Sequence, residues 1–202
     1  MELIHPFACI VSGPSRSGKT TFVAKVIRHA TSMIKRSVSR VVYCYNNYQE
    51  VFKTMHNVEF HAGLDILEEL KVCSEDTLII VDDFMTETAK IADYFTRFSH
   101  HSAKSICYIT QNLYHKGKGA RDLSLSSSYM VIFKNPRDQQ QISFLGRQMY
   151  PNSRFLTEAY RDAARQPHSY LFLDLTQEAP ENRRVMTNIF PGETMVVYSP
   201  MV

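Results

Sequence analysis

The sequence predicts an α/β fold, a mostly parallel central sheet with helices packed on both faces. Short apolar runs of strand length alternate with longer segments of helical spacing, the order that parallel strands joined by crossover helices produce. Several strand-like runs are apolar almost throughout, as expected for strands covered on both faces. The chain has 202 residues and shows neither a repeat nor a linker. We therefore expect one domain over residues 1–202, with a core at about 7–175 and a strand extension at about 176–202.

The first half of the chain begins this alternation. Residues 6–11 form a short apolar run that leads directly into a glycine, and they predict a buried strand. From residue 19 to residue 34 the apolar side chains recur on one face of a helix. Residues 41–45 predict a second strand and residues 58–61 a short additional one. Residues 65–70 predict a helix.

The second half continues in the same way. Residues 77–81 are apolar after the first position and predict a third strand, which the amphipathic helix 86–98 follows. Residues 105–109 and 129–133 predict the fourth and fifth strands, because both runs are short and mainly apolar. The remaining predicted elements are helices at about 139–149 and 153–165 and strands at 170–175 and 185–190.

Composition and charge set limits on the function. The net charge is +3 and the pI is about 8.6, a mildly basic balance that permits contact with nucleic acid without requiring it. No apolar run reaches the length of a membrane span, and the N-terminus lacks the features of a signal peptide. Cys9, Cys44, Cys73 and Cys107 fit no zinc-ligand spacing, and we interpret them as reduced. We therefore expect a protein of the cell interior, neither secreted nor membrane-bound.

A phosphate-binding loop follows the first strand. The segment GPSRSGKT at residues 13–20 fits G-x-x-x-x-G-K-[ST] at every fixed position. The two glycines let the backbone curl so that several N–H groups point at one anion, and the next helix directs its positive N-terminal end at the same phosphates. Lys19 would contact the β- and γ-phosphates, and the Thr20 hydroxyl would bind Mg²⁺. The alternative is a glycine turn with an exposed lysine. The predicted nucleotide-binding residues are Gly13, Pro14, Ser15, Arg16, Ser17, Gly18, Lys19, Thr20 and Thr21.

Two carboxylates end the third predicted strand. Asp82 and Asp83 directly follow the apolar run 77–81. In a P-loop protein an acid at this place meets the Mg²⁺ that Thr20 holds, so we predict that Asp82 binds the metal through a water. Asp83 would then polarise the water that attacks the γ-phosphate, with Glu87 as the alternative base. A surface turn or a helix N-cap is the competing interpretation, since Asp also suits those positions.

Two amides end the fourth predicted strand. Gln111 and Asn112 follow the run CYIT, and ligands of parallel sheets bind beyond the carboxyl ends of the strands. Either amide could therefore hydrogen-bond the γ-phosphate and report its loss, and we count both as candidate catalytic residues. Ordinary loop polarity is the alternative.

A basic, glycine-rich segment, HKGKGAR at residues 115–121, comes next. We expect a mobile loop, which could follow a DNA phosphate backbone. Arg121 could also reach the nucleotide of a neighbouring subunit as an arginine finger, with Lys134 and Arg137 as competing candidates. A solvated loop is the alternative.

Two further groups of residues predict less. His100 and His101 have no carboxylate or cysteine at metal-ligand spacing, so we expect a helix end and no metal site. Tyr43, Tyr45 and Tyr48 could stack on a nucleobase, but strand tyrosines are more often core or interface residues.

Along the chain, the motifs come in the order GPSRSGKT, TLIIVDD, YITQN, the basic segment and MVIFKNPRD. This ordered set resembles the genome-packaging ATPases of the FtsK–HerA superfamily. They are most similar to the poxvirus-type group carried by large DNA viruses, virophages and Polinton (Maverick) elements. The resemblance covers about residues 7–175, and its specific part is the strand-amide motif YITQN together with the run KNPRD. Asp83 stands where this group frequently has Glu, so the identity of the base stays open.

The resemblance implies a P-loop NTPase of the additional-strand type, with a five-stranded core in which another strand separates the Walker A strand from the Walker B strand. It implies ATP and Mg²⁺ as cofactors. It also implies a homo-oligomeric ring that drives double-stranded DNA into a preformed capsid. The expected partners are therefore double-stranded DNA, further copies of the chain and capsid or portal proteins, in the virion, the viral factory or the nucleus.

Two other functions fit a P-loop. A small-molecule kinase, acting for example on nucleosides or nucleotides, needs an acceptor pocket and usually a mobile arginine-rich lid, and no lid-like insertion is evident in the sequence. A regulatory GTPase needs a base-reading N-K-x-D motif, which the run FKNPRD does not supply. The sequence therefore favours the DNA-translocating ATPase, with the kinase as the alternative.

Overall fold

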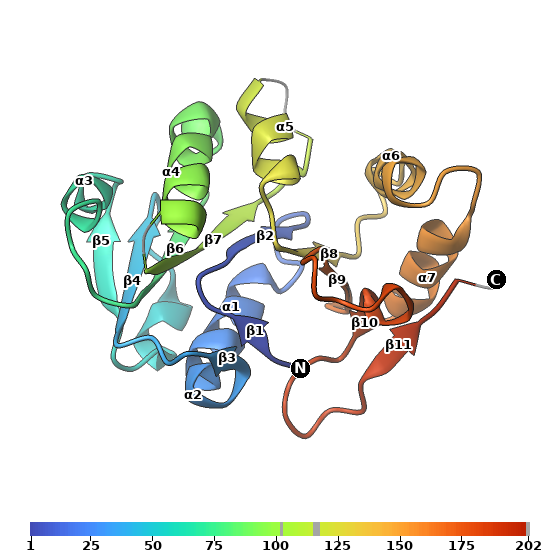
Figure 1. The fold of residues 1–202 in the computed structure, drawn as a ribbon, viewed down its shortest axis with the longest axis horizontal. Helices are drawn as coiled ribbons and strands as arrows, with labels where there is room; N and C mark the ends of the chain where they lie inside the picture. Colours follow the sequence, from blue (N-terminus) through green and yellow to red (C-terminus); the bar gives the residue numbers. More distant parts are fainter. Residues whose placement is uncertain (102, 115–117, 201–202) are drawn as a thin grey trace.

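The computed structural model describes residues 1–101, 103–114 and 118–200, and a nine-stranded sheet forms the centre of this part of the chain (Figure 1). Six neighbouring strands run parallel in the order β8-β2-β7-β6-β4-β5. Beyond β8, the strands β9, β10 and β11 continue the sheet by antiparallel pairing. The bounds are β2 (Ala8–Ser12), β4 (Arg40–Tyr45), β5 (Glu59–Ala62), β6 (Thr77–Asp82), β7 (Lys104–Thr110), β8 (Tyr129–Phe133), β9 (Tyr170–Asp174), β10 (Val185–Thr187) and β11 (Val196–Tyr198).

The order of the central strands brings the predicted motifs to one edge. β7 lies between β2 and β6, so a strand separates the phosphate-loop strand from the acidic strand, as the resemblance implies. Ser12 pairs with Thr110, and Asp82 pairs with both Ile109 and Tyr45. The carboxyl ends of β2, β7, β6 and β4 therefore lie side by side.

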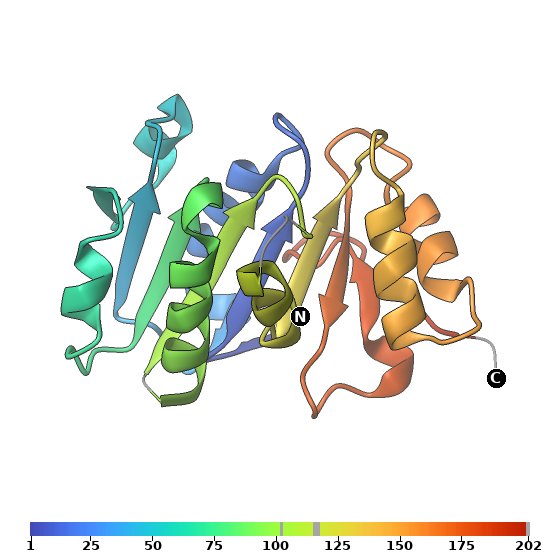
Figure 2. The ribbon, with the colours of Figure 1, turned by 90° about the horizontal axis from the view of Figure 1, so that it is seen from above.

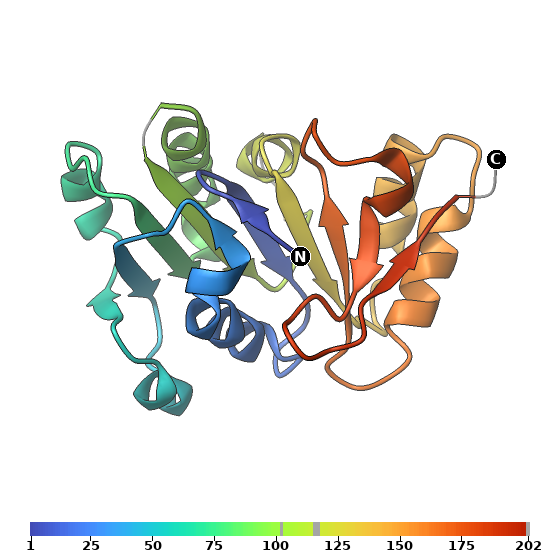
Figure 3. The same cartoon turned by 60° about the horizontal axis from the view of Figure 1, so that its bottom comes forward.

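Helices cover both faces of the sheet, as predicted (Figures 1 and 2). One face carries α3 to α7, and the other carries α1 and α2, which lie in front of the strands in Figure 3. No helix among the described residues is both long enough and apolar enough to cross a membrane. The bounds are α1 (Lys19–Arg28), α2 (Ala30–Met33), α3 (Ile66–Leu70), α4 (Thr88–His101), α5 (Lys118–Leu125), α6 (Gln140–Met149) and α7 (Phe155–Ala163), with short 3₁₀ helices η1 (Glu50–Thr54), η2 (Met85–Glu87) and η3 (Glu181–Arg183).

Two apolar cores follow from the alternation of side chains along the strands. Ile10 of β2 and Val81 of β6 belong to the core under α3 to α7. Val11 and Ile80, one position away on the same strands, belong to the core under α1. The strands are apolar on both faces because each face is covered by a core.

The predicted strands are confirmed, most of them to within two residues, but one predicted helix is wrong in extent. The segment 19–34 is divided: α1 ends at Arg28, the short α2 follows, and Ile34 is extended. Ile34 belongs to the two-residue strand β3 (Ile34–Lys35), which pairs in parallel with β1 (Leu3–Ile4). The helical periodicity of the apolar residues continues to Ile34, but the pairing of β3 with β1 makes Ile34 extended.

Candidate nucleotide-binding site

The phosphate loop joins β2 to α1, and its geometry requires both glycines. A Cβ on Gly13 would lie 2.6 Å from Phe133 Cβ, so only glycine fits there. Gly18 has φ of 106°, in the region that favours glycine. The Gly13 N–H donates to Thr110 O at 3.2 Å, which joins the loop to the end of β7. The first turn of α1 thus presents its free N–H groups beside a fixed loop.

Lys19 folds back over the loop. Its Nζ donates to the carbonyl oxygens of Gly13 at 2.7 Å and Pro14 at 2.9 Å. Burial lowers the pKa of Lys19 below its usual value, against the opposing charges of Asp82 and Asp83. A bound phosphate chain would offer the ammonium stronger, charged acceptors in place of these two carbonyls.

Asp82 is the last residue of β6, and it is buried with 4% of its surface exposed. Its Oδ2 accepts hydrogen bonds from Tyr43 Oη at 2.8 Å and from Gln49 Nε2 at 3.0 Å. Burial raises the pKa of Asp82 and the neighbouring Asp83 charge adds to this, while the hydrogen bond from Tyr43 and the charge of Lys19 oppose it. Burial thus disfavours the ionised form of this carboxylate, and a cation bound beside it would stabilise that form.

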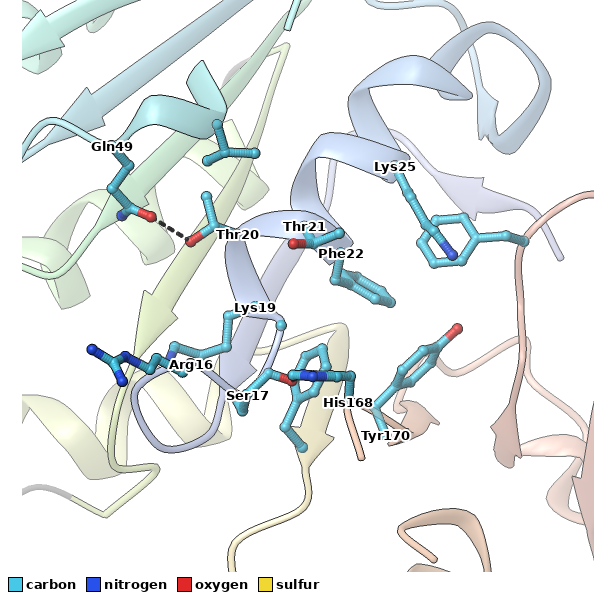
Figure 4. A pocket seen from close by; sticks show the side chains of 14 residues that line it. Arg16, Ser17, Lys19, Thr20, Thr21, Phe22, Lys25, Gln49, His168 and Tyr170 are labelled. Carbon is cyan, nitrogen blue, oxygen red and sulfur yellow. Dashed lines mark hydrogen bonds between the residues drawn. The ribbon is translucent and has the colours of Figure 1, made fainter. Parts of the chain in front are cut away.

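Thr20 is connected to Asp82 through one side chain that sequence reasoning missed. Thr20 Oγ1 donates to Gln49 Oε1 at 3.2 Å (Figure 4), and Gln49 Nε2 donates to Asp82 Oδ2. The signal that could have found it is positional: the strand at 41–45 ends at the same sheet edge, and Gln49 follows it in a polar run, NNYQ.

The donor set at this place fits Mg²⁺. A threonine hydroxyl and a carboxylate are hard oxygen ligands, and Mg²⁺ characteristically takes few protein ligands and completes its shell with waters and phosphates. Among the described residues, no group of three His, Cys, Asp or Glu side chains could hold a metal by itself. Thr20 and Asp82 would therefore hold the ion together with a nucleotide.

Asp83 and Gln111 meet in front of the loop. Asp83 has φ of 64°, so the backbone turns sharply after β6 and separates the two carboxylates. Gln111 Nε2 donates to Asp83 Oδ1 at 3.4 Å, and Gln111 Oε1 accepts from Ser15 Oγ at 3.4 Å. Gln111 therefore links the phosphate loop to the predicted base. Glu87, the alternative base, is half-buried in η2.

Asn112 does not lie with these groups. Its Oδ1 accepts a hydrogen bond from Tyr114 N at 2.9 Å, which uses the side chain to close the turn after β7. The prediction that Asn112 contacts the γ-phosphate is therefore not supported, and the amide of Gln111 is the one directed at the loop.

The predicted mobile loop at 115–121 is wrong in part. Residues 118–121 belong to α5, and residues 115–117 lie outside the described part of the chain. The Gly119 backbone packs against Thr88 and Ala89 at the start of α4. Arg121 is exposed on a helix and not on a loop. Of the competing candidates, Lys134 donates to Arg165 O at 2.8 Å, and Arg137 is exposed in the turn after β8.

Tyr43 is a core residue, and stacking of this tyrosine on a nucleobase is excluded. Tyr43 is fully buried and bonded to Asp82, so it cannot stack on a base. Tyr48 is 56% exposed and Tyr45 is half-buried. The helix α4 ends at His101, as expected for the histidine pair, whose side chains lie outside the description.

A pocket of about 580 Å³ opens beside the loop and continues along the first turns of α1 (Figure 4). His168 Nδ1 donates to Ser17 O at 3.2 Å, so the segment before β9 touches the phosphate loop directly. The far end of the pocket is aromatic. Its lining includes Thr21, Lys25, Gln49, Val51, Phe133, His168, Tyr170 and Phe190.

Comparisons with known proteins give little beyond general similarity. No family model and no curated protein matches the sequence. Among solved structures, the chain is similar to the flagellar accessory protein FlaH from Methanocaldococcus jannaschii, with a TM-score of 0.46 and 12% identity, over 63% of this chain and 70% of that chain. It is also similar to the N-terminal domain of zonular occludens toxin from Neisseria meningitidis, with a TM-score of 0.39 and 17% identity, over 63% of this chain and 76% of that chain.

The geometry of this chain defines its fold. A glycine loop ending in Lys19 and Thr20 joins a central strand to a helix. The acidic strand β6 ends beside it, and β7 lies between the two strands. The protein therefore has the α/β fold of a P-loop NTPase, with one strand inserted between the phosphate-loop strand and the acidic strand.

Proposed function

We propose that this protein hydrolyses ATP with Mg²⁺. One observation carries the proposal: the groups needed for phosphoryl transfer to water meet at one edge of the sheet although they come from three separate segments. Lys19 and Thr20 come from α1, Asp82 and Asp83 from the end of β6, and Gln111 from the end of β7, where it contacts Ser15 and Asp83.

Each group has a role that follows from its position. The loop N–H groups and Lys19 hold the phosphate chain and offset the charge that develops on the transferring phosphoryl group. Thr20 and Asp82 would hold Mg²⁺, which would supply positive charge to the phosphate oxygens. Asp83 accepts the proton of the attacking water, and Gln111 orients the carboxylate of Asp83.

The pocket beside the loop is the place for the nucleoside. Phosphates bound by the loop would lie over the first turn of α1, and the ribose and base would then extend along the helix, where Thr21 and Lys25 line the pocket. The aromatic side chains of Tyr170 and Phe190 form its far wall and suit a base. A pocket of about 580 Å³ is large enough for a nucleoside, given that ligand pockets measure roughly 300–1,000 Å³.

Phosphate release tests this proposal. The wild-type protein should hydrolyse ATP with Mg²⁺ and stop when the metal is chelated. Lys19→Ala should lower the rate by roughly a hundredfold or more, because a preorganised charge on the transition state is lost. Lys35→Ala, which removes an exposed lysine in β3, is the control and should retain the wild-type rate. Near-wild-type hydrolysis by Lys19→Ala would refute the assignment.

We further propose that hydrolysis drives double-stranded DNA into a capsid. The support is the resemblance of GPSRSGKT, TLIIVDD, YITQN and MVIFKNPRD to the FtsK–HerA packaging ATPases. The mildly basic chain is compatible with a DNA substrate. On this proposal the active form is a ring of identical subunits that contacts capsid or portal proteins in the virion, the viral factory or the nucleus.

A further inference from the structure

A side-chain amide occupies the space between the two groups expected to hold Mg²⁺. Gln49 Oε1 accepts from Thr20 Oγ1 at 3.2 Å, and Gln49 Nε2 donates to Asp82 Oδ2 at 3.0 Å. An ionised carboxylate only accepts hydrogen bonds, so the amide nitrogen faces Asp82 and the amide oxygen faces Thr20. Figure 4 shows the amide directed at the Thr20 hydroxyl.

The backbone of Gln49 is held in place and does not belong to a loose loop. The Phe52 N–H donates to Gln49 O at 3.0 Å, which starts η1 directly after Gln49. Phe52 is buried and stacks on Phe60, with the ring centroids 5.0 Å apart, and it also packs against Tyr43. This aromatic cluster fixes the segment, so the amide is presented to the site by packing.

Resting on the nucleotide site proposed above, we propose that Gln49 bridges Thr20 and Asp82 in the nucleotide-free protein and is displaced when Mg²⁺ binds with the nucleotide. The amide and a metal ion compete for the same two partners. Mg²⁺ keeps most of its waters, so the ion and the water expected to link it to Asp82 would need the space that the amide fills between Thr20 and Asp82.

The displacement has a measurable consequence. Binding of Mg²⁺ breaks two hydrogen bonds, one of them to the buried carboxylate of Asp82. Gln49 therefore lowers the affinity of the nucleotide-bound protein for Mg²⁺. It leaves the affinity for nucleotide in the absence of Mg²⁺ unchanged. A residue that merely supported the fold would not separate these two affinities.

The test is a Mg²⁺ titration of the protein saturated with a non-hydrolysable ATP analogue, together with the affinity for that analogue in EDTA. Gln49→Ala should increase the Mg²⁺ affinity by roughly three- to tenfold, about the strength of one net hydrogen bond, and leave the affinity in EDTA unchanged. Gln49→Asn keeps the amide but is one methylene too short to reach both partners, so it should show a similar gain. This second variant answers the question if Gln49→Ala does not fold.

Tyr43→Phe is the matched control, because it removes the other hydrogen bond to the same Asp82 oxygen and leaves the amide in place. It should give no gain in Mg²⁺ affinity. A gain in Tyr43→Phe equal to that in Gln49→Ala would assign the effect to the charge of Asp82 and overturn the inference. An unchanged or weaker Mg²⁺ affinity in both Gln49 variants would overturn it as well. A wild-type protein that binds neither Mg²⁺ nor nucleotide would refute the proposed function as well as the role of Gln49. The affinities of the wild-type protein therefore distinguish this failure from failure of the Gln49 inference alone.

Discussion

At the scale of single residues, adjacent carboxylates differ because the backbone turns between them. Asp82 is the last residue of a buried strand and faces Tyr43 and Gln49. Asp83 has a left-handed φ of 64° and faces Gln111 instead. A residue in this conformation is strained, and such strain is common at active sites. The same dipeptide thus supplies one group suited to a metal and one suited to a water.

Asp82→Asn should stabilise the nucleotide-free protein and abolish its stabilisation by Mg²⁺ and nucleotide. Burial raises the pKa of Asp82 in the folded state, so folding favours the protonated carboxyl. The stabilisation that protonated Asp82 gives is fully present below the unfolded pKa of about 3.8 and is lost as the pH rises through the folded pKa. At pH 7 the ionised group therefore costs stability, which the amide avoids.

Thermal unfolding at several pH values measures this effect. A gain of about 1 kcal/mol would raise the Tm by roughly 2–4 °C at pH 7. The wild-type protein should become more stable as the pH falls from 7 toward 4, relative to Asp82→Asn. A nucleotide-free Asp82→Asn protein that is less stable at pH 7 would show that Asp82 serves the fold and not a metal.

Asp83→Asn should spare nucleotide binding and lower the hydrolysis rate by roughly 10²–10⁴, because it removes a general base and no ligand. Glu87→Gln is the comparison and should retain most of the activity. The two variants are assayed for binding of ATP by calorimetry and for turnover by phosphate release. The opposite result, with Glu87→Gln inactive and Asp83→Asn active, would identify Glu87 as the base.

The sequence predicts the site residues unevenly. The phosphate loop follows a fixed spacing, and Asp82 ends an apolar run, so both are visible from sequence alone. Gln49 lies 29 positions from Thr20 and 33 from Asp82, and no spacing rule connects them. His168 reaches Ser17 across 151 positions, so this contact also required the fold.

At the scale of elements, the strands were predictable because a strand buried on both faces leaves a short apolar run in the sequence. The helix α5 was not, since its first residues, Lys118 and Gly119, continue a segment with the composition of a loop. The packing of Gly119 against α4 supplies the missing reason. The strand β11 also escaped prediction because it is only three residues long and none of its residues is fully buried.

Gly119→Ala tests the close approach of α5 to α4. The added Cβ would lie 2.8 Å from Ala89 Cα and 2.9 Å from Ala89 N, and backbone atoms cannot yield cheaply. We expect a loss of about 1–3 kcal/mol in the free energy of unfolding, measured with denaturant. Gly146→Ala in α6 is the control, because its Cβ would meet Leu156 at an ordinary 3.5 Å, and it should be neutral or stabilising. A Gly119→Ala protein as stable as the wild type would contradict the close approach of α5 to α4.

At the scale of the whole molecule, the sheet explains why distant motifs form one site. Parallel pairing of β2, β7 and β6 aligns their carboxyl ends, so the phosphate loop, Gln111 and the two carboxylates reach one edge. Alternating strands and helices predict this class of sheet. The position of β7 between β2 and β6 was predicted from the resemblance and not from periodicity. Periodicity shows where a strand lies in the sequence but not which strands are its neighbours in the sheet.

Assembly gives a test in mixed rings. A P-loop that receives an arginine from a neighbouring subunit can be accelerated by roughly 10³–10⁵. Arg121 is exposed on α5 and remains our first candidate, ahead of Arg137 and Lys134. Arg121→Ala should bind ATP normally and inhibit wild-type neighbours, and Lys19→Ala subunits, which keep the arginine, should restore activity to Arg121→Ala subunits. If no mixture rescues activity, the experiment is repeated with Arg137→Ala and Lys134→Ala, and failure of all three would exclude these residues from action in trans.

The most direct test of a DNA-driven ring ATPase is the rate of ATP hydrolysis per subunit, measured with and without double-stranded DNA over a range of protein concentrations. If the protein acts as the proposed ring and DNA promotes its assembly, the rate should rise with protein concentration and rise further with DNA, irrespective of its sequence. Added salt should weaken the DNA effect steeply. A rate per subunit that stays constant across concentration and does not respond to DNA would contradict the ring ATPase and favour a monomeric P-loop kinase.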